Sequence, residues 1–255
     1  MGHNGQFPKS LLYRYPKGHK MKFHFMNNGL PVEAEFPDDD VEQIYVPLLK
    51  HLSELQQQKQ GRILVMLAAP PGAGKSTMAA FLAELSGQRR MSPITVIGMD
   101  GFHRYQDYLL THHTTRNGET IPLVKIKGAP ETFDLEKLTD RVRQTANGER
   151  CLWPVYDRTL HNPVEDAVTV DGEIILLEGN YLLLDEPGWR ELSGYADYTI
   201  FIRAEEAQLR ERLVSRQIQS GKSPEDAVSF VENSDLVNAR LVLARSKNAD
   251  IILNI

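Results

Sequence analysis

Residues 68–77, with the sequence AAPPGAGKST, constrain the fold of this chain more than any other segment. They match a phosphate-binding loop (P-loop), in which backbone N–H groups surround a polyphosphate, the lysine reaches its terminal phosphates and the serine hydroxyl ligates Mg²⁺. The motif normally begins with glycine, whereas this chain has Ala69 there, a change of one methyl group. The residues expected to bind the phosphates are Pro71, Gly72, Ala73, Gly74, Lys75, Ser76 and Thr77.

The segments on either side of this loop support the assignment. Residues 63–67 are five consecutive apolar side chains, which is typical of a parallel strand buried on both faces. After the loop, Met78, Phe81, Leu82 and Leu85 recur at helical spacing. The loop therefore opens a helix, whose N-terminus favours anions.

Apolar runs alternate with helical patterns along the rest of the chain. Strands are predicted at residues 94–99, 174–177, 198–202 and 251–253, with a helix after Asp134 and two helices over about 205–245. This alternation predicts an α/β fold, in which a parallel sheet is covered by helices on both faces. Ligands of such folds bind beyond the carboxyl ends of the strands, so we expect the chemistry where the apolar runs end.

The first sixty residues follow a different pattern. Residues 1–20 lack periodicity, and we expect them to form a mobile arm. The turn signal Asn27-Asn28-Gly29 separates two segments that predict a β-hairpin, and a helix is predicted after the acidic residues 38–40. Residues 56–61 are expected to be a polar linker. The predicted units are therefore an arm (1–20), a hairpin and helix appendage (21–60) and a P-loop domain (61–255).

Length, charge and cysteine content narrow the class of protein. The 255 residues are enough to bury a substantial core. A net charge of −5 argues against a nucleic-acid-binding surface, so a small molecule is the expected partner. The single cysteine fits a reducing cytosol, and no apolar run approaches the ~20 residues of a membrane span. We expect a cytoplasmic protein without a membrane partner, and whether it forms a homodimer stays open.

Two of the predicted strands end in carboxylates. Asp100 follows the run 94–99, where it can accept the proton of an attacking hydroxyl or hold Mg²⁺ through water. The alternative is an aspartate that caps the turn before Gly101. Glu178 follows the run 174–177, where a carboxylate is the usual second ligand for the magnesium ion of a nucleotide. Ser76, Glu178 and Asp100 are therefore the predicted metal-site residues.

Five motifs occur together in one order. They are the P-loop, Asp100-Gly101-Phe102, the segment 127–134 (KGAPETFD), Tyr156-Asp157-Arg158 with His161, and Glu178-Gly179-Asn180. Residues 62–255 thereby resemble the uridine kinase, phosphoribulokinase and bacterial pantothenate kinase superfamily, and most of all a bacterial branch of unsettled substrate labelled nucleoside or fructose kinase. The resemblance to that branch extends to the N-terminal hairpin. It implies a P-loop NTPase fold, ATP and Mg²⁺ as cofactors, and transfer of the γ-phosphoryl group to a hydroxyl of a small molecule.

The resemblance also implies roles for single residues. Asp100 matches the catalytic aspartate and acts with Lys75, while Glu178 matches the metal-site carboxylate. Asp134 falls where relatives hold substrate hydroxyls, although its place before a helix suits an N-cap equally well.

Three further residues are expected at the acceptor. Tyr156 and His161 match positions that face the acceptor, where a ring can stack and an imidazole can hydrogen-bond, although either residue can simply pack. Arg104, in the segment after Asp100, is also expected to bind substrate.

Residues 210–216 resemble the lid helix of the same superfamily. Arg212 and Arg216 lie four residues apart, so they share a face and can reach one anion. The alternative is a solvated charged face paired with neighbouring glutamates. The resemblance favours a mobile lid near 205–222 that closes over ATP, with Gly221 relaxing the backbone. An unliganded structure is expected to show this segment either displaced from the P-loop or with raised B-factors.

Two functions from different classes are compatible with these observations. The first is a metabolic kinase whose acceptor is a sugar or polyol, a nucleoside or a pantothenate-like acid, in that order of preference. The second is a nucleotide-sensing ATPase or regulator that has no acceptor. Because only the first needs Asp100, Asp134 and Tyr156, we favour the kinase.

Overall fold

The computed structural model describes residues 18, 20–27, 30–116 and 118–255. The strands in chain order are β1 (Lys20–Asn27), β2 (Leu30–Pro37), β3 (Ile63–Ala68), β4 (Ile94–Gly98), β5 (His113–Arg116), β6 (Glu119–Pro122), β7 (Cys151–Asp157), β8 (Asn162–Val170), β9 (Ile174–Gly179), β10 (Tyr198–Arg203) and β11 (Ile251–Asn254). The helices are α1 (Asp38–Asp40), α2 (Val46–Lys59), α3 (Lys75–Gln88), α4 (Gln106–Thr111), α5 (Leu135–Ala146), α6 (Glu206–Gln219), α7 (Pro224–Phe230) and α8 (Leu236–Arg245). Short π-helical turns join α1 to α2 and α7 to α8.

A five-stranded parallel sheet in the order β11-β10-β3-β9-β4 forms the centre of the molecule. Strand β9 lies between β3 and β4, and its Glu178 is in register with Leu67 on one side and Gly98 on the other. The segments that follow these three strands therefore emerge at one edge of the sheet. This edge carries the P-loop, Glu178 and Asp100.

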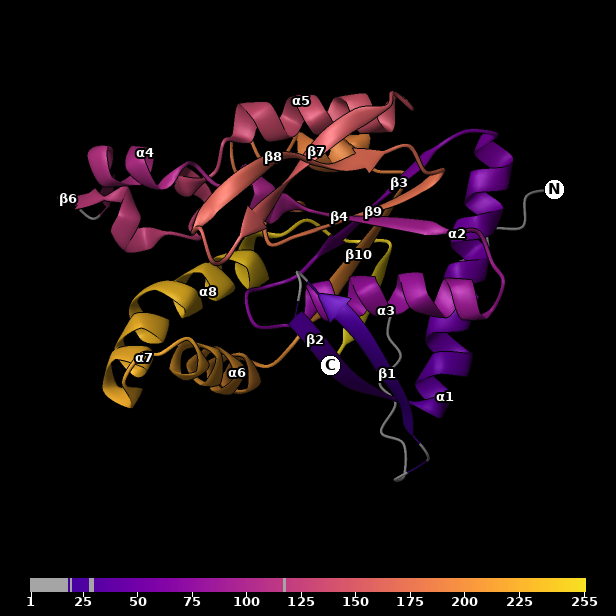
Figure 1. The fold of residues 1–255 in the computed structure, drawn as a ribbon, viewed down its shortest axis with the longest axis horizontal. Helices are drawn as coiled ribbons and strands as arrows, with labels where there is room; N and C mark the ends of the chain where they lie inside the picture. Colours follow the sequence, from indigo (N-terminus) through magenta and orange to yellow (C-terminus); the bar gives the residue numbers. More distant parts are fainter. Residues whose placement is uncertain (1–17, 19, 28–29, 117) are drawn as a thin grey trace.

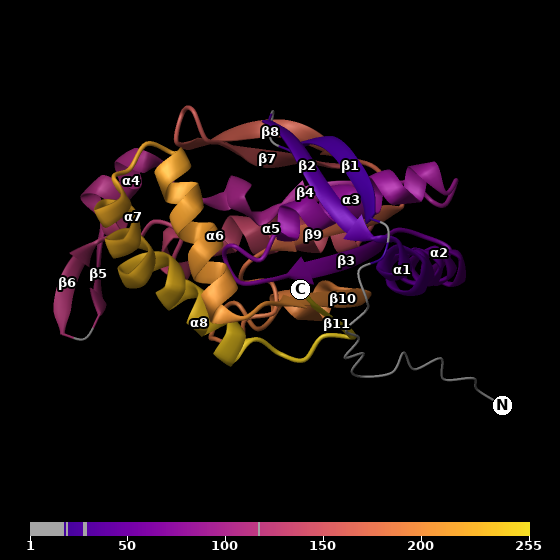
Figure 2. The ribbon, with the colours of Figure 1, turned by 90° about the horizontal axis from the view of Figure 1, so that it is seen from below.

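Helices cover both faces of this sheet, so its central strands are buried on both sides. Val65 and Leu67 of β3 pack with α2, α3 and the β1–β2 hairpin, whereas Leu64 and Met66 pack with α5 and β7 on the other face. Figure 1 shows α5 and the β7–β8 hairpin above the sheet and α3 below it. From below, β1–β2 lies in front of α3, and α6, α7 and α8 gather at one end of the sheet (Figure 2).

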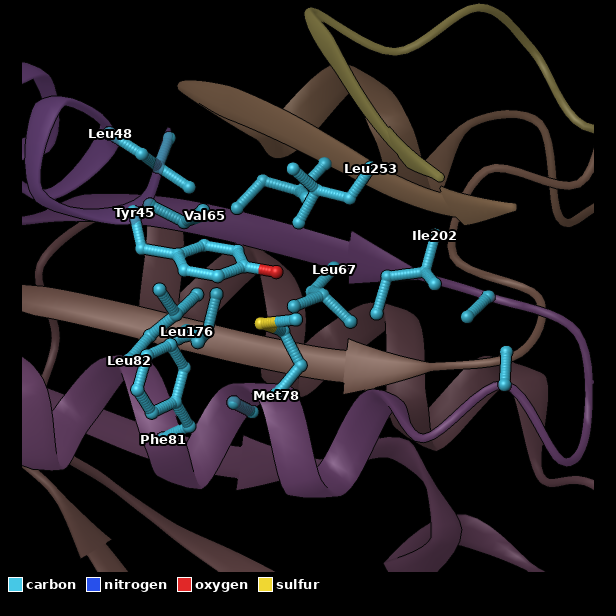
Figure 3. Packing of buried hydrophobic residues seen from close by; sticks show 14 of the residues in the cluster. Tyr45, Leu48, Val65, Leu67, Met78, Phe81, Leu82, Leu176, Ile202 and Leu253 are labelled. Carbon is cyan, nitrogen blue, oxygen red and sulfur yellow. The ribbon is translucent and has the colours of Figure 1, made fainter. Parts of the chain in front are cut away.

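The N-terminal hairpin shares a core with the helix that follows the P-loop. The ring of Phe81 in α3 is stacked on Phe36 of β2, with 3.7 Å between ring centres. Phe23 and Tyr45 contact the same ring edge-on, at 4.7 and 5.2 Å. Figure 3 shows Tyr45 beside Val65 of the central sheet, and Phe81 beside Leu82 on the helix below it. Hairpin, α2 and α3 therefore belong to one hydrophobic cluster.

The observed elements confirm the predicted fold class and the predicted hairpin. The predicted linker 56–61 is wrong for its first residues, because α2 continues to Lys59 and ends at Gln60 in a left-handed conformation. The hairpins β5–β6 and β7–β8 were not predicted. Residues 28–29 of the predicted turn, and 1–17 and 19 of the predicted arm, lie outside the described residues. In the part of the chain described, no helix is both long and apolar enough to cross a membrane.

Candidate active site

The P-loop joins β3 to α3 through two glycines in the left-handed region, Gly72 at φ 82° and Gly74 at φ 80°. Residues that carry a side chain rarely adopt such φ angles, so glycine is the residue suited to both positions. Helix α3 begins directly afterwards, at Lys75. The methyl group of Ala69, which replaces the first glycine of the motif, is fully buried in the core. The core therefore accommodates alanine at position 69, and the loop still turns at Gly72 and Gly74.

Lys75, Ser76 and Glu178 meet at the start of α3. The Ser76 hydroxyl donates to Glu178 Oε1 at 2.8 Å, and Lys75 Nζ lies 3.9 Å from Glu178 Oε2. Glu178 is 8% exposed. Burial and the nearby charge of Asp100 raise the pKa of Glu178, against the opposing influence of Lys75 and the Ser76 hydroxyl. Its Oε2 atom is buried without a hydrogen-bond partner among the described residues.

Asp100 lies in a short 3₁₀ turn that follows β4. Burial raises the pKa of its carboxyl, but the electrostatic influence of Lys75, followed by His103, Arg158 and Arg216, outweighs burial, and the net pKa is lowered. Asp100 is therefore ionised at neutral pH. The adjacent His103 is buried, which lowers its pKa, and its Nδ1 donates to the carbonyl oxygen of Asp100 at 2.8 Å.

A cavity of about 240 Å³ brings the predicted reacting groups together. Ser76, Asp100 and Glu178 line it, and Tyr156 and Arg158 of the β7–β8 hairpin face them. Its apolar wall comprises Ala80, Val96, Ile97, Trp153, Val155 and Val168.

The β7–β8 hairpin is held close to the end of β4. Trp153 Nε1 donates to the Gly98 carbonyl at 2.8 Å. A Cβ atom on Gly101 would lie only 2.1 Å from the Pro154 carbonyl oxygen. The close approach of β7 to the turn that holds Asp100 therefore depends on a glycine at this position.

Of the residues predicted to bind the acceptor, only Tyr156 lines this cavity. Its ring centre lies 5.1 Å from that of His103 and 5.2 Å from Lys127 Nζ. His161 is exposed at the turn between β7 and β8, with φ at 53°, so the structure does not bring it to the cavity as expected.

Asp134 and Arg104 bind each other outside the lining of the cavity. Asp134 Oδ1 accepts from the Lys137 backbone N–H at 3.2 Å, which confirms the N-cap of α5. Its Oδ2 accepts from Arg104 Nη1 at 2.8 Å. The substrate contacts expected of both residues stay predictions, because the two side chains neutralise each other in this structure.

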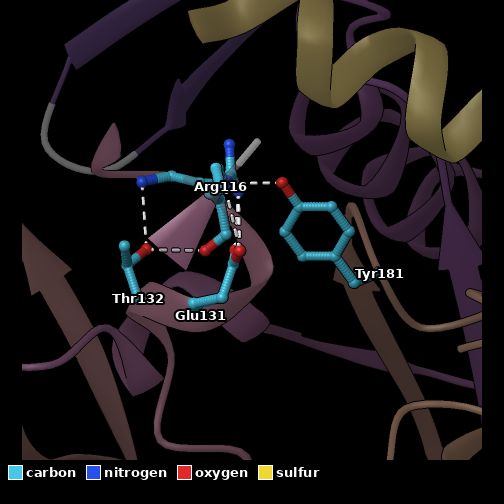
Figure 4. A network of polar contacts seen from close by, with 6 residues as sticks. Arg116, Glu131, Thr132 and Tyr181 are labelled. Carbon is cyan, nitrogen blue, oxygen red and sulfur yellow. Dashed lines mark hydrogen bonds and ion pairs between the residues drawn. The ribbon is translucent and has the colours of Figure 1, made fainter. Parts of the chain in front are cut away.

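A polar network fixes the loop 127–134 beside the sheet (Figure 4). Arg116 of β5 donates to Glu131 through Nη2, at 2.7 and 2.8 Å, and through Nε, at 3.0 Å. Thr132 accepts from the Gly128 N–H at 3.1 Å, and the Tyr181 hydroxyl donates to the Gly128 carbonyl at 2.5 Å. The network ties the β5–β6 hairpin and this loop to the end of β9.

The predicted lid corresponds to α6 and the turn after it, in which Gly221 has φ 97°. Leu209 and Leu213 of α6 are fully buried, and a Cβ atom on Gly72 would lie 2.9 Å from Leu213 Cγ. The expected displacement of this segment from the P-loop is therefore absent from this structure. Its mobility stays a prediction.

The two arginines proposed for the lid differ in their surroundings. Arg216 Nη2 lies 3.7 Å from Oδ2 of Asp235, and Asp235 is the last residue of the π turn before α8. Arg212 is exposed, and no described residue forms an ion pair or side-chain hydrogen bond with it. Of these two arginines, Arg216 is among the charges that lower the pKa of Asp100, and Arg212 is not.

Sequence reasoning missed Arg158, Lys127 and His103 as residues of the site. Arg158 ends the motif Tyr156-Asp157-Arg158, and Lys127 begins the motif 127–134. His103 directly follows the motif Asp100-Gly101-Phe102 and precedes Arg104, which was assigned a role. The available signal was a basic residue next to a candidate catalytic or substrate-binding position. Spacing alone does not tell which neighbour points inward.

The oxygen atoms of the site fit a magnesium ion. No group of three or more His, Cys, Asp or Glu side chains that could hold a metal exists within the described ranges. Mg²⁺ bound with a nucleotide needs few protein ligands, since water and phosphate oxygens complete its shell. The Ser76 hydroxyl and the unpartnered Oε2 of Glu178 suit that requirement.

Comparisons with known proteins agree with this geometry. The sequence profile of the Phosphoribulokinase / Uridine kinase family matches residues 64–255. The uncharacterised protein YggC of Escherichia coli (strain K12) is 42% identical over 91% of this chain and 95% of its own length. A candidate uridine kinase of Schizosaccharomyces pombe is 30% identical over 88% of this chain and 94% of its own length.

A solved structure is similar as well. The crystal structure of a candidate fructose transport system kinase from Silicibacter sp. TM1040 superposes with a TM-score of 0.68 at 34% identity. The superposition covers 79% of this chain and 98% of the chain from Silicibacter.

Proposed function

The chain belongs to the Phosphoribulokinase / Uridine kinase family, and from this premise we propose that it is an ATP-dependent kinase that phosphorylates a hydroxyl of a sugar or a nucleoside. The observation that carries the proposal is the cavity in which Ser76, Glu178 and Asp100 meet side chains of the β7–β8 hairpin. A nucleotide switch needs the P-loop and Glu178, but not a pocket between Asp100 and Tyr156. The relatives named after uridine and fructose transport support this acceptor class.

Each side chain has a task in this reaction. The loop N–H groups and Lys75 bind the phosphates of ATP, and Ser76 and Glu178 would hold Mg²⁺. When bound, the ion neutralises negative charge on the β- and γ-phosphates. Asp100 orients the acceptor hydroxyl and takes its proton. The acceptor oxygen bonds to the γ-phosphorus, the bond from that phosphorus to the bridging oxygen breaks, and ADP leaves with its electron pair.

An ATP-consumption screen with the purified protein tests the proposal. Sugars, nucleosides and vitamins are offered with Mg·ATP, and ADP release is measured with each acceptor and without one. We expect acceptor-dependent release by the wild type and none by Lys75→Ala. Lys75 is the first residue of α3 and belongs to neither large hydrophobic cluster, so its removal opens no core cavity and we expect the variant to keep its fold. Its melting temperature is measured as well, because the variant also loses the ion pair with Glu178 at 3.9 Å.

Lys50→Ala, at an exposed position of α2, is the matched control. Normal turnover and ATP affinity in Lys75→Ala would contradict the assignment of the P-loop. ADP release that is the same with every acceptor and without one would favour the nucleotide-sensing ATPase instead.

A further inference from the structure

Arg158 is a basic residue of the cavity that the proposed phosphoryl transfer does not use. It directly follows β7, at the start of the turn to β8, and it lines the cavity with Asp100 and Glu178. Burial raises the pKa of both carboxyls, and the charge of Arg158 is among the influences that lower them. The guanidinium therefore lies within electrostatic reach of the reacting groups.

Arg158 has no acidic partner in the part of the chain that the structure describes. Its side chain is exposed, and with the described residues it forms neither an ion pair nor a side-chain hydrogen bond. The neighbouring Asp157 does not neutralise it, because Asp157 Oδ1 accepts from the backbone N–H groups of Thr159 and Leu160, at 2.7 and 2.9 Å. The carboxylate thus holds the turn, while the donors of Arg158 stay available on the cavity side.

Other arginines nearby show that such pairing is common in this region. Arg104 binds Asp134 and Arg116 binds Glu131, at 2.8 and 2.7 Å. Arg158 is thus the arginine of this neighbourhood whose planar donor set has no protein acceptor among the described residues.

Lys127 is a second cation close to Tyr156, although it is not itself among the residues that line the cavity. Its Nζ donates to Gln106 Oε1 at 2.8 Å and to the His161 carbonyl at 3.0 Å, both neutral acceptors. It also lies 5.2 Å from the ring centre of Tyr156. Burial lowers the pKa of Lys127, and no carboxylate among the described residues pairs with Lys127 to offset this lowering. Two cations without a carboxylate partner among the described residues therefore lie near Tyr156, which lines the cavity.

We propose that Arg158, supported by the positive charge of Lys127 near Tyr156, binds an oxyanion of the acceptor, either a carboxylate or a phosphate monoester. A guanidinium with free donors matches these groups through two parallel N–H···O bonds. An anion held at the β7–β8 turn leaves the hydroxyl of the acceptor to face Asp100, and the apolar wall packs against its carbon chain. The inference rests on the proposed function and narrows the acceptor to sugar acids, sugar phosphates or nucleotides.

The competing use of Arg158 is contact with the phosphates of ATP. Loss of an ATP contact weakens the affinity for nucleotide whatever the acceptor. Loss of an acceptor contact weakens only acceptors that carry the anion. The two uses are therefore separated by measuring nucleotide and acceptor affinity in the same variants.

The experiment compares probes that differ in the anionic group. D-gluconate is paired with D-sorbitol, and ribose 5-phosphate with ribose, so that the two arms separate carboxylate from phosphate. Binding is measured by calorimetry in the presence of a non-hydrolysable ATP analogue, and kcat/KM by ADP release. The variants are Arg158→Gln, Arg158→Lys and, as control, Arg143→Gln, an exposed arginine of α5 whose partner is Asp140.

We expect the wild type to bind at least one anionic probe more tightly than its neutral partner. Arg158→Gln should weaken that probe by about 10- to 150-fold, the range of a hydrogen bond to a charged group. It should leave the neutral probe and the ATP analogue unchanged. Arg158→Lys should fall between, because it keeps the charge and loses the planar fork. Arg143→Gln should resemble the wild type.

Equal binding of anionic and neutral probes by the wild type would overturn the inference. So would an equal loss of affinity for the ATP analogue in Arg158→Gln. The proposed function fails separately: binding of an anionic probe without any phosphoryl transfer would remove the kinase assignment and keep the anion site. Transfer to neutral acceptors at equal rates in the wild type and Arg158→Gln would instead remove the anion site and keep the kinase assignment.

Discussion

Asp100 lies where the positive charges of the site converge. Its lowered pKa keeps it ionised, so it can accept a hydrogen bond from the acceptor hydroxyl throughout the neutral range. Asp100→Asn preserves the shape of the side chain and removes the base. We expect kcat to fall about 10²- to 10⁴-fold, the usual contribution of a general base, with little change in nucleotide affinity. Steady-state kinetics and calorimetry measure the two quantities.

Asp140→Asn, on the exposed face of α5, controls for the loss of one negative charge. A normal kcat in Asp100→Asn would return Asp100 to the alternative role of a residue that caps the turn before Gly101.

Gly101 is the second residue on which the site depends, for a steric reason. In Gly101→Ala the new methyl group would lie 2.1 Å from the Pro154 carbonyl, and this neighbour is backbone, which cannot rotate away. Overpacking of this kind typically costs about 1–3 kcal/mol, so urea unfolding should show a loss in that range. The cavity should also open, because β7 must move away from the turn that holds Asp100.

Gly87→Ala is the matched control for this substitution. Gly87 lies inside α3, and no heavy atom would come within 4 Å of its new methyl group. Alanine is the better helix former by about 0.5–1 kcal/mol, so this variant should be as stable as the wild type or more stable. Equal stability of the two variants would show that the gap between β7 and the turn adapts freely.

At the scale of elements, α6 combines an anchored part with an exposed part. Leu209 and Leu213 hold its first half against the P-loop, whereas Arg216 lies beyond them and pairs with Asp235. We predict that a non-hydrolysable ATP analogue slows hydrogen exchange over residues 214–222 more than over 206–213. The physical reason is that buried leucines already protect the first half, whereas phosphate contacts can order the second.

Hydrogen exchange with mass spectrometry at several times measures this difference, and α5 serves as an internal reference. Slow exchange across 205–222 that is identical with and without the analogue would remove the lid, since a lid that never opens cannot admit substrate.

At the scale of the whole molecule, the aromatic cluster of Phe23, Phe36, Tyr45 and Phe81 links the N-terminal hairpin to the nucleotide-binding core. We propose that residues 21–60 and 61–255 unfold together. Phe36→Ala should then destabilise the entire protein by about 3–5 kcal/mol, as expected for a buried aromatic residue. Calorimetry should show one transition, shifted to a lower temperature.

Val237→Ala, at an exposed position of α8, is the control and should change the stability by less than about 0.5 kcal/mol. Two separate transitions, of which Phe36→Ala shifts only one, would support the predicted division into an appendage and a P-loop domain.

Local pattern was sufficient to predict the central sheet and the placement of its chemistry. Residues 63–68 of β3 and 174–177 of β9 are apolar without interruption because both faces of these strands are buried, so the sequence marks them clearly. The β7–β8 hairpin escaped prediction because Pro154 and Pro163 interrupt its strands and its register shifts between Trp153 and Val155. Proline and irregular pairing remove the alternation that identifies a half-buried strand.

The sequence by itself determined that a P-loop, Asp100 and Glu178 would stand at one edge of a parallel sheet, since segments that follow parallel strands emerge at the same edge. Only the tertiary structure decided which other side chains join them. Arg158 lines the cavity, whereas His161, three residues further along, lies exposed in the turn. That choice depends on how the β7–β8 hairpin packs against β4 and Gly101, and contacts between segments so distant in sequence leave no periodic pattern in the chain.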